Sequence, residues 1–339
     1  MVILESLAMS PKCSLVNETY VDFEKRFNKE LCATDDYRRF KSQGWLVTIL
    51  CCTVFITSIV HIIISWTVYE LPTLQTISWH ALLSAFAMQF RILELITHLT
   101  GLNEFAIILR YNLNEMGERN IRRVFGPYLL GRSFVKGNVI RVKPKTSQPS
   151  EEEDERKLRV YKKFYGEIFI MFKTINECYG WSLLFYMMMY FLYVIINSYR
   201  VVVWLISQNQ EENDMIRIFI MLMIVVVQLW ILCWQCQNSH EQSHQIGCNM
   251  YKLVKPSGNK SYNELVTDFS LQVLHQEFSI TAKQFFNLDL SLLGSMIAST
   301  VTYLVILVQF MFADKNKAAP KLIVNRFVNF GNTTVRTSE

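Results

Sequence analysis

Five long apolar runs, separated by polar segments, dominate the hydrophobic pattern of this chain. The hydrocarbon core of a bilayer is about 30 Å thick, so a helix needs about 20 mostly apolar residues to cross it. Every backbone N–H and C=O must also be bonded inside the membrane, and an α-helix achieves this within one segment. The predicted spans are therefore Trp45–Val68, Thr76–Leu99, Tyr179–Ile206, Ile216–Trp234 and Leu288–Phe312.

The second run is the weakest because it contains Arg91, Glu94 and His98. Such groups are costly in lipid unless they face other helices or lie near the membrane surface. The alternative is a hairpin on the soluble side, which would leave the apolar stretch WHALLSAFAMQF exposed and put both flanking loops on one side. We therefore favour a span.

Composition narrows the fold class further. Hydrophobic residues make up 51% of the chain and charged residues 19%, with a mean hydropathy of +0.19, whereas about a quarter of the residues of a soluble domain are charged. With 12 Gly and 7 Pro, the chain has too few turn-forming residues for a lipid-facing β-barrel. The sequence predicts an all-α membrane protein, a multi-span helical bundle. The net charge of +5 is too small and too dispersed to indicate nucleic acid binding.

The distribution of Lys and Arg predicts the orientation of the spans, because short cytosolic loops carry the excess of positive charge. Residues 1–44 contain about seven, residues 111–178 about fourteen and residues 237–287 about four, whereas the loop YELPTLQ after the first span contains none. The N-terminus is therefore predicted inside and, with an odd number of spans, the C-terminus outside. A sequon in that outer tail makes Asn332 a candidate glycosylation site.

Apolar residues also recur at helical spacing in the segments assigned to the cytosol. One series enters the third span directly, and a second precedes the last span. We expect both helices to bury these stripes against each other in a cytosolic helical region. The first series is Leu158, Tyr161, Tyr165, Ile168, Phe172 and Ile175, and the second is Leu265, Phe269, Val273 and Leu274.

These patterns divide the chain into seven segments. Residues 141–156 (RVKPKTSQPSEEEDER) have no apolar period and are predicted to be a disordered loop. The segments are a cytosolic N-terminal segment (1–44), the first two spans (45–110), a basic cytosolic loop with a helical anchor (111–178), the third and fourth spans (179–236), cytosolic anchor helices (237–287), the last span (288–312) and an extracellular tail (313–339).

Catalytic and metal-binding signals are weak. No phosphate-binding loop, nucleophile elbow or zinc-protease motif occurs, so we predict no enzyme activity and no cofactor. Cys233, Cys236, His240, His244 and Cys248 share one face of a helix, but a straight helix spreads them over about 22 Å at 1.5 Å per residue, too far for one tetrahedral ion. We therefore predict no metal site.

Polar and aromatic residues concentrate toward the outer half of the spans. Each of them taken singly is typical of an interfacial aromatic or an interhelical hydrogen bond. As a cluster they indicate a small-molecule pocket that opens outward between helices. The candidate ligand-binding residues are His61, Trp66, His80, Tyr193, Asn197 and Gln228.

The last span differs from the others because small and hydroxylated residues line one of its faces, a pattern that suits either close helix packing or a pore. It continues with Thr302-Tyr303, five aliphatic residues and Gln309-Phe310. This stretch matches the TYhhhhhQF signature of insect gustatory receptors, and the preceding FFNLDLSLLGSMIAST resembles the start of their final helix. The resemblance is strongest over residues 260–312.

The resemblance implies a ligand-gated, non-selective cation channel that detects a small-molecule tastant in the plasma membrane of a sensory neuron dendrite. It implies a homo- or hetero-tetramer with other chemoreceptor subunits, in which the last helix lines the pore and the cytosolic helices form an anchor. Gln309 and Phe310 would form the outer constriction, and Tyr303, next to Thr302, would transmit ligand-induced movement. An apolar ring can dewet a constriction, and exposing a polar side chain rewets it.

The family has seven spans, so the five predicted here correspond to its third to seventh. The first two helices are then expected to be missing, through either a truncated gene model or a shorter isoform. Two alternatives remain open at this point. An odorant-receptor subunit shares the topology but lacks this form of the signature, and a membrane carrier would be expected to show inverted repeats.

Overall fold

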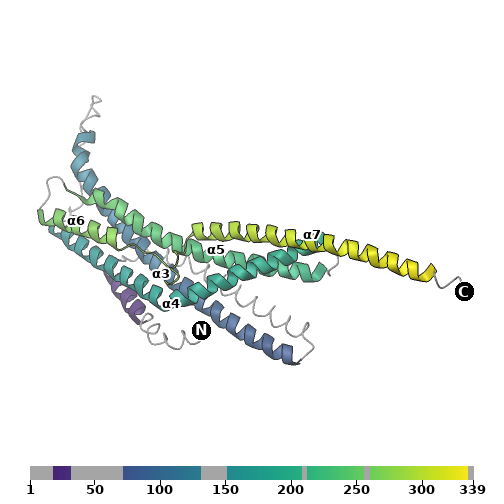
Figure 1. Ribbon diagram of the computed structural model, residues 1–339. Helices are drawn as coiled ribbons and strands as arrows, with labels where there is room; N and C mark the ends of the chain where they lie inside the picture. Colours follow the sequence, from purple (N-terminus) through teal and green to yellow (C-terminus); the bar gives the residue numbers. More distant parts are fainter. Residues whose placement is uncertain (1–17, 32–71, 131–150, 208–211, 256–259, 335–339) are drawn as a thin grey trace. The chain divides into compact units, whose positions relative to one another are not determined.

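The computed structural model describes residues 18–31, 72–130, 151–207, 212–255 and 260–334. The predicted first span, Trp45–Val68, lies outside these residues. Figure 1 labels the helices α3 to α7. The elements are a helix over residues 18–31, α3 (Pro72–Leu130), α4 (Glu151–Ser207), α5 (Glu212–Asn249), the 3₁₀ helix η1 (Met250–Leu253), α6 (Lys260–His275) and α7 (Leu290–Thr334).

The predicted fold class is confirmed. In the described part of the chain, extended pairing is confined to one isolated bridge between Thr281 and Asn287, and everything else that is regular is helical. Four helical stretches are long and apolar enough to cross a membrane, which makes this a multi-pass membrane protein. They are Ala87–Arg123, Glu151–Leu205, Ile218–Leu253 and Leu290–Ala313.

The chain forms two compact units. The first comprises residues up to Phe185 together with Ile231–Leu290, and the second comprises Tyr186–Trp230 and the residues from Ser291 onward. Helices α4 and α5 contribute to both units, and nearly all of α7 belongs to the second. The first unit therefore contains the predicted cytosolic helices, and the second contains the predicted pore residues and three of the six predicted ligand-binding residues.

The core of the first unit confirms the apolar stripe of α4. All six predicted residues of that stripe are at most 8% exposed. In the α6 stripe, Leu265, Phe269 and Val273 are buried, but Leu274 is 66% exposed. The reason is geometric: three residues at intervals of four stay on one face, whereas the next residue is rotated by about 100°.

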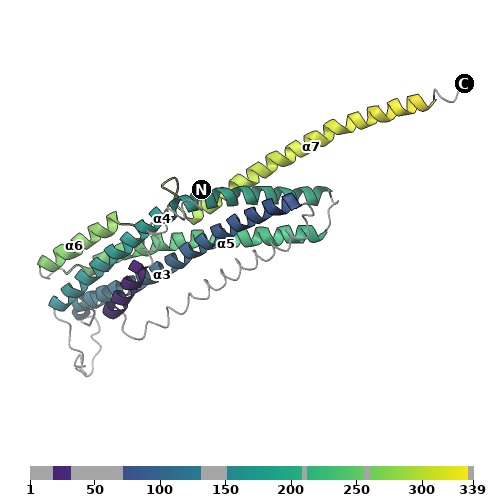
Figure 2. The same cartoon turned by 90° about the horizontal axis from the view of Figure 1, so that it is seen from below.

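A helix absent from the predicted spans completes this core. Residues 18–31 lie beside α4 in both views (Figures 1 and 2). Phe23 and Phe27 are at most 1% exposed. The ring of Phe23 lies 5.1 Å from that of Phe105, and the ring of Phe27 lies 5.1 Å from that of Phe164. This short helix thus joins α3 to α4 through an aromatic cluster.

Tyr165 links three more elements of the same unit. Its hydroxyl donates to the carbonyl of Gln276 at 2.6 Å and shares a hydrogen bond of 2.8 Å with Ser243. Its ring packs 5.7 Å from Phe269 of α6 and 4.8 Å from Phe278. One side chain of α4 therefore contacts α5, α6 and the segment that follows α6.

The start of α4 corrects the predicted disordered loop over residues 141–156. Residues 151–156 are helical, and residues 141–150 lie outside the described ranges. The acidic first turn, Glu151 to Asp154, stabilises a helix N-terminus because it faces the positive end of the helix dipole. Ion pairs at i,i+4 spacing from Glu153 to Lys157 and from Glu155 to Arg159 add to this.

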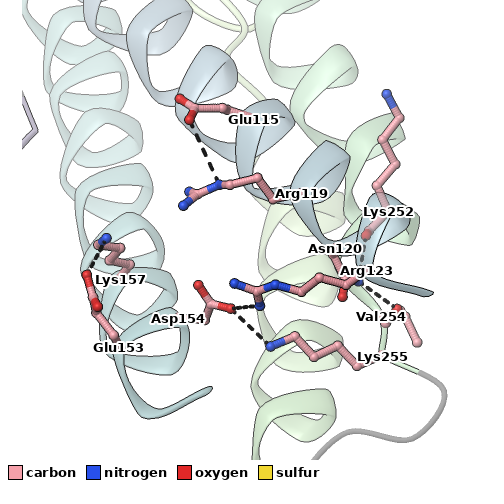
Figure 3. Close-up of polar contacts among 10 residues, drawn as sticks. All are labelled: Glu115, Arg119, Asn120, Arg123, Glu153, Asp154, Lys157, Lys252, Val254 and Lys255. Atoms are coloured by element: carbon pink, nitrogen blue, oxygen red, sulfur yellow. Dashed lines mark hydrogen bonds and ion pairs between the residues drawn. The ribbon is translucent and has the colours of Figure 1, made fainter. Parts of the chain in front are cut away.

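A buried charge cluster ties α3 and α4 to the connection between η1 and α6. Figure 3 shows the Asp154 carboxylate facing both Arg123 and Lys255. One Asp154 oxygen accepts hydrogen bonds from Arg123 at 2.8 Å and from Lys255 at 3.2 Å. The Lys255 ammonium also lies 4.2 Å from the ring of Tyr262, whose pKa is raised by burial. The cluster holds two cations and one carboxylate.

A neighbouring contact fixes η1 against α3. The amide of Asn120 donates to the carbonyls of Lys252 and Val254 at 3.0 and 3.1 Å (Figure 3). At Gly117 of α3, an added Cβ would lie only 2.7 Å from the Cβ of Lys252. Glycine is therefore required here for the close approach of the two elements.

A short hairpin leads from α6 to α7. Leu288 N–H donates to the carbonyl of Ile280 at 2.9 Å, and Phe285 N–H donates to that of Ala282 at 3.0 Å. Lys283 and Gln284, the two residues between Ala282 and Phe285, have positive φ angles of 51° and 65°. Both φ values are those of a tight hairpin turn, in a conformation that residues other than Gly rarely adopt.

Candidate pore helix and ligand-binding residues

Helix α7 places its apolar side chains outward. In the most apolar stretch of Leu290–Ala313, only 6% of the residues are buried within the chain, compared with 67% in the corresponding stretch of Ala87–Arg123. Val301, Val305 and Phe310 are 55%, 51% and 67% exposed. An apolar helix of this kind requires lipid or other subunits around it.

The hydroxyl groups of α7 bond to its own backbone. Ser295, Ser299, Thr300 and Thr302 each donate to the carbonyl four residues earlier, at 2.8–3.0 Å. Their protons are thus satisfied without a partner helix, while the hydroxyl oxygens remain able to accept from water. At Gly294, nothing lies within 4 Å of an added Cβ, so this glycine serves no close contact inside the chain.

The signature residues form two adjacent stripes on α7. Thr302 and Gln309 are seven residues apart, as are Tyr303 and Phe310, and seven residues make almost two complete turns. Gln309 therefore lies on the same stripe as Thr302, two turns further along the helix, and Phe310 lies in the same way on the stripe of Tyr303. All four side chains are exposed. A rotation of about 100° would exchange an aromatic stripe for a polar one.

Tyr303 also contacts α4. Its ring lies 6.4 Å from that of Phe191 in an edge-to-face arrangement, within the second unit. Tyr303 is nevertheless 51% exposed. The side chain thus contacts α4 while part of its ring stays on the exposed face of α7.

The predicted ligand-binding residues differ in what the structure says of them. His61 and Trp66 lie outside the described residues, and for His80 on α3 only the backbone is described. Tyr193 and Asn197 lie on α4, and Gln228 lies on α5; all three belong to the second unit. Asn197 is 8% exposed, and its amide donates to the carbonyl of Tyr193 at 2.8 Å.

Gln228 is the most informative of these residues. It is 5% exposed, and its buried side-chain oxygen accepts no hydrogen bond from the residues that the structure describes. A buried polar atom without a partner costs free energy, so such an atom calls for a ligand, a water molecule or another subunit. The bond from Asn197 back to its own helix has no such implication.

Two further aromatic residues lie on the same face of α4 as Tyr193 and Asn197. Tyr186 is 1% exposed, and its ring centroid lies 4.1 Å from that of Tyr190, which in turn lies 6.4 Å from that of Tyr193. Tyr186, Tyr190, Tyr193 and Asn197 follow each other at steps of four, three and four. This helical spacing is visible in the sequence and could have indicated one face of α4.

A buried polar network that joins α3 to α5 could not have been found from any local spacing in the sequence. Asn103 donates to the side-chain oxygen of Gln235 at 3.1 Å, and Gln235 donates to the hydroxyl of Thr100 at 3.1 Å. Asn103 and Gln235 have no exposed surface, and Thr100 is 6% exposed. The partners are more than 130 residues apart, so no local pattern pairs them.

The row of cysteines and histidines on α5 separates into unrelated contacts. Cys233 and Cys236 are buried, His240 lies 4.0 Å from Glu277, and the sulfur of Cys248 lies 3.7 Å from Nδ1 of His244. Among the described residues, no three His, Cys, Asp or Glu side chains converge on a point where a metal ion could bind.

The sequence matches the family model described as 7tm Chemosensory receptor over residues 15–314. The chain belongs to this family. The family is one of receptors and not of enzymes. Among curated chemosensory receptors, the chain is 42% identical over 175 residues to Gustatory receptor 23a of Drosophila melanogaster, covering 51% of this chain and 47% of that protein.

A second relative is Putative gustatory receptor 2a of Drosophila melanogaster, which is 25% identical over 206 residues, covering 53% of this chain and 47% of that protein. These relatives confirm the predicted likeness to insect gustatory receptors. The chain spans about half the length of the curated chemosensory receptors it matches.

The fold resembles that of the insect olfactory receptor OR5 from Machilis hrabei, with a TM-score of 0.63 over 91% of this chain and 77% of that one, at 12% identity. The structure of the same receptor in complex with eugenol gives a TM-score of 0.57 over 91% and 79% of the two chains, at 14% identity. At these identities the likeness shows that the chemosensory receptor fold is shared.

Proposed function

We propose that this chain is a gustatory receptor subunit, a ligand-gated, non-selective cation channel that detects a small-molecule tastant. The observation that carries the proposal is the exposure of α7. This helix is long and apolar enough to span a membrane, yet only 6% of its most apolar stretch is buried within the chain. Symmetric assembly, either as a homomer or with other chemoreceptor subunits, would surround a central pore with this helix. The cell membrane of a taste neuron is the site where such a channel would act.

The two stripes of α7 support a gate at its outer end. Phe310 of each subunit would form an apolar constriction that water and ions do not cross, and Gln309 on the adjacent stripe would rewet the constriction when the helix turns. Tyr303, in contact with Phe191 of α4, is placed to pass movement of α4 to this part of α7.

The ligand would bind among the polar and aromatic residues of the second unit, namely Tyr193, Asn197 and Gln228. The orphan oxygen of Gln228 favours a ligand with a hydrogen-bond donor. Binding opens the channel only to the extent that the ligand has a higher affinity for the open state.

The test is whole-cell recording from cells that lack chemoreceptors, during a panel of tastants, with the chain expressed alone and with other gustatory subunits. We expect a ligand-evoked cation current whose closed-state leak rises in Phe310→Ala and whose amplitude falls in Gln309→Ala. Phe312→Ala is the matched control, because Phe312 is also exposed on α7, at 47%, but lies about 200° around the helix from Phe310.

Two results would contradict the proposal. One is that no tastant evokes a current, although the chain is confirmed at the cell surface, whether it is expressed alone or with any of the other gustatory subunits. The other is a current on which Phe310→Ala and Phe312→Ala have the same effect, because a pore-lining stripe and the opposite face would then be equivalent.

A further inference from the structure

The turn of the hairpin that follows α6 lies against α4 at Gly180 and Trp181. An added Cβ at Gly180 would lie 3.3 Å from Cδ of Lys283 and 3.5 Å from its Cα, so the stem of Lys283 runs directly over this glycine. The Lys283 ammonium then lies 5.8 Å from the centre of the Trp181 ring. Trp181 of α4 is 41% exposed, and Phe285, which follows the turn, is 71% exposed.

The hairpin is held firmly on α4, so these exposed side chains have a fixed position. The amide of Asn176 donates to the carbonyl of Ser279 at 2.7 Å, and its oxygen accepts from the N–H of Thr281 at 3.0 Å. The arms of the hairpin bury Phe278, Ile280, Ala282 and Leu288, each at most 2% exposed. Lys283 and Gln284 keep positive φ angles although neither is glycine, a conformation that has an energetic cost and is maintained by the surrounding contacts.

The predicted third span and the start of α7 both put this turn at the membrane boundary. Trp181 is at the beginning of the predicted third span, and Phe285 lies five residues before the first residue of α7. The Lys and Arg distribution assigns this end of both spans to the cytosolic side. An exposed Trp and Phe beside a Lys are typical of side chains at the level of lipid headgroups.

The charge of Lys283 is uncompensated within the described part of the chain. Lys157, Lys252 and Lys255 pair with carboxylates there, whereas the only contact that the structure describes for the Lys283 ammonium is the Trp181 ring. The cytosolic leaflet is the one rich in anionic lipids, which attract such cations.

From this geometry we propose that Lys283, Trp181 and Phe285 form a binding site for an anionic phospholipid of the cytosolic leaflet. The Lys283 ammonium binds the anionic headgroup, while Trp181 and Phe285 contact the glycerol region and the upper acyl chains. The site is independent of the ligand and pore proposed above. Because the hairpin connects α6 to α7, a bound lipid is positioned to stabilise the start of the last helix.

The test uses tryptophan fluorescence of the full chain in phosphatidylcholine vesicles that contain a minor fraction of brominated phosphatidylserine, or the same fraction of brominated phosphatidylcholine. The chain has 7 Trp, so the part of the quenching that is lost in Trp181→Phe isolates Trp181. We expect that part to show an apparent affinity about fivefold higher for the brominated phosphatidylserine, the contribution of one lysine near an anionic surface.

Three variants make the result specific to Lys283. Lys283→Gln removes the preference for phosphatidylserine, and we expect it to fold because Gln already adopts a positive φ angle at position 284. Lys283→Arg keeps the preference. Lys260→Gln also keeps it, because Lys260 is 92% exposed on α6 but is not part of the turn.

Equal quenching by the two brominated lipids, unchanged by Lys283→Gln, would overturn the proposal by showing that Trp181 meets bulk lipid. The absence of any Trp181 component would also overturn it, because a second copy of the chain or another protein would then cover the turn.

Discussion

At the scale of single residues, the most consequential side chain of the first unit is Asp154. Its side chain is 5% exposed and is the one carboxylate between Arg123 and Lys255, whose side chains are 29% and 9% exposed. Opposite charges that are buried together can be replaced at little cost, but removing one partner leaves the other uncompensated. Asp154 faces two such partners.

We expect Asp154→Asn to destabilise the folded chain by about 3 kcal/mol, the lower end of the cost of breaking a buried ion pair. The matched control is Glu153→Gln, one residue away, because Glu153 and Lys157 are 43% and 38% exposed and a pair so exposed contributes under about 1 kcal/mol. Thermal unfolding of the purified protein in detergent measures both. Equal shifts in the two variants would contradict the role given to Asp154.

At the scale of elements, the helices were more predictable from the sequence than their contacts. Period and length predicted four of the described spans and the buried stripe of α4, because burial imposes a repeat on a single segment. The turn of Lys283 and Gln284 was not predictable, since its residues lack the usual Gly or Asn. The pairing of Asn103 with Gln235 depends on two distant segments. The start of α4 was missed because apolar period says nothing of charge stabilisation at helix ends.

Close approach between elements gives a prediction for two glycines. Gly117→Ala would place a Cβ 2.7 Å from that of Lys252, and we expect this overpacking to cost about 1–3 kcal/mol by pushing η1 away from α3. Gly294→Ala meets nothing within 4 Å in the chain, and alanine gains about 0.5–1 kcal/mol over glycine inside a helix. The melting temperature should therefore fall in the first variant and not in the second. A fall in Gly294→Ala alone would mean that this position packs closely against another subunit.

At the scale of the whole molecule, the two units follow different rules of burial. The first buries its stripes, its aromatic cluster and its charges within one chain. The second exposes the apolar surface of α7, which one chain cannot cover. Helix α7 therefore needs lipid or other protein around it, and the sequence expresses this as a helix without a buried stripe.

The proposed assembly of subunits around α7 predicts that Cd²⁺ blocks the channel when cysteine replaces Gln309. Cysteines introduced at Gln309 would converge from several subunits on the pore axis, and converging thiolates bind soft divalent cations. We expect micromolar Cd²⁺ to block the ligand-evoked current of Gln309→Cys and to leave the unsubstituted channel conducting, whose own 8 Cys serve as the background. Met311→Cys is the control, because Met311 lies on the same helix but about 200° around it from Gln309. Block of both variants alike would place neither position specifically at the constriction, whereas block of Gln309→Cys alone requires that copies of this one stripe face one another across the conduction path.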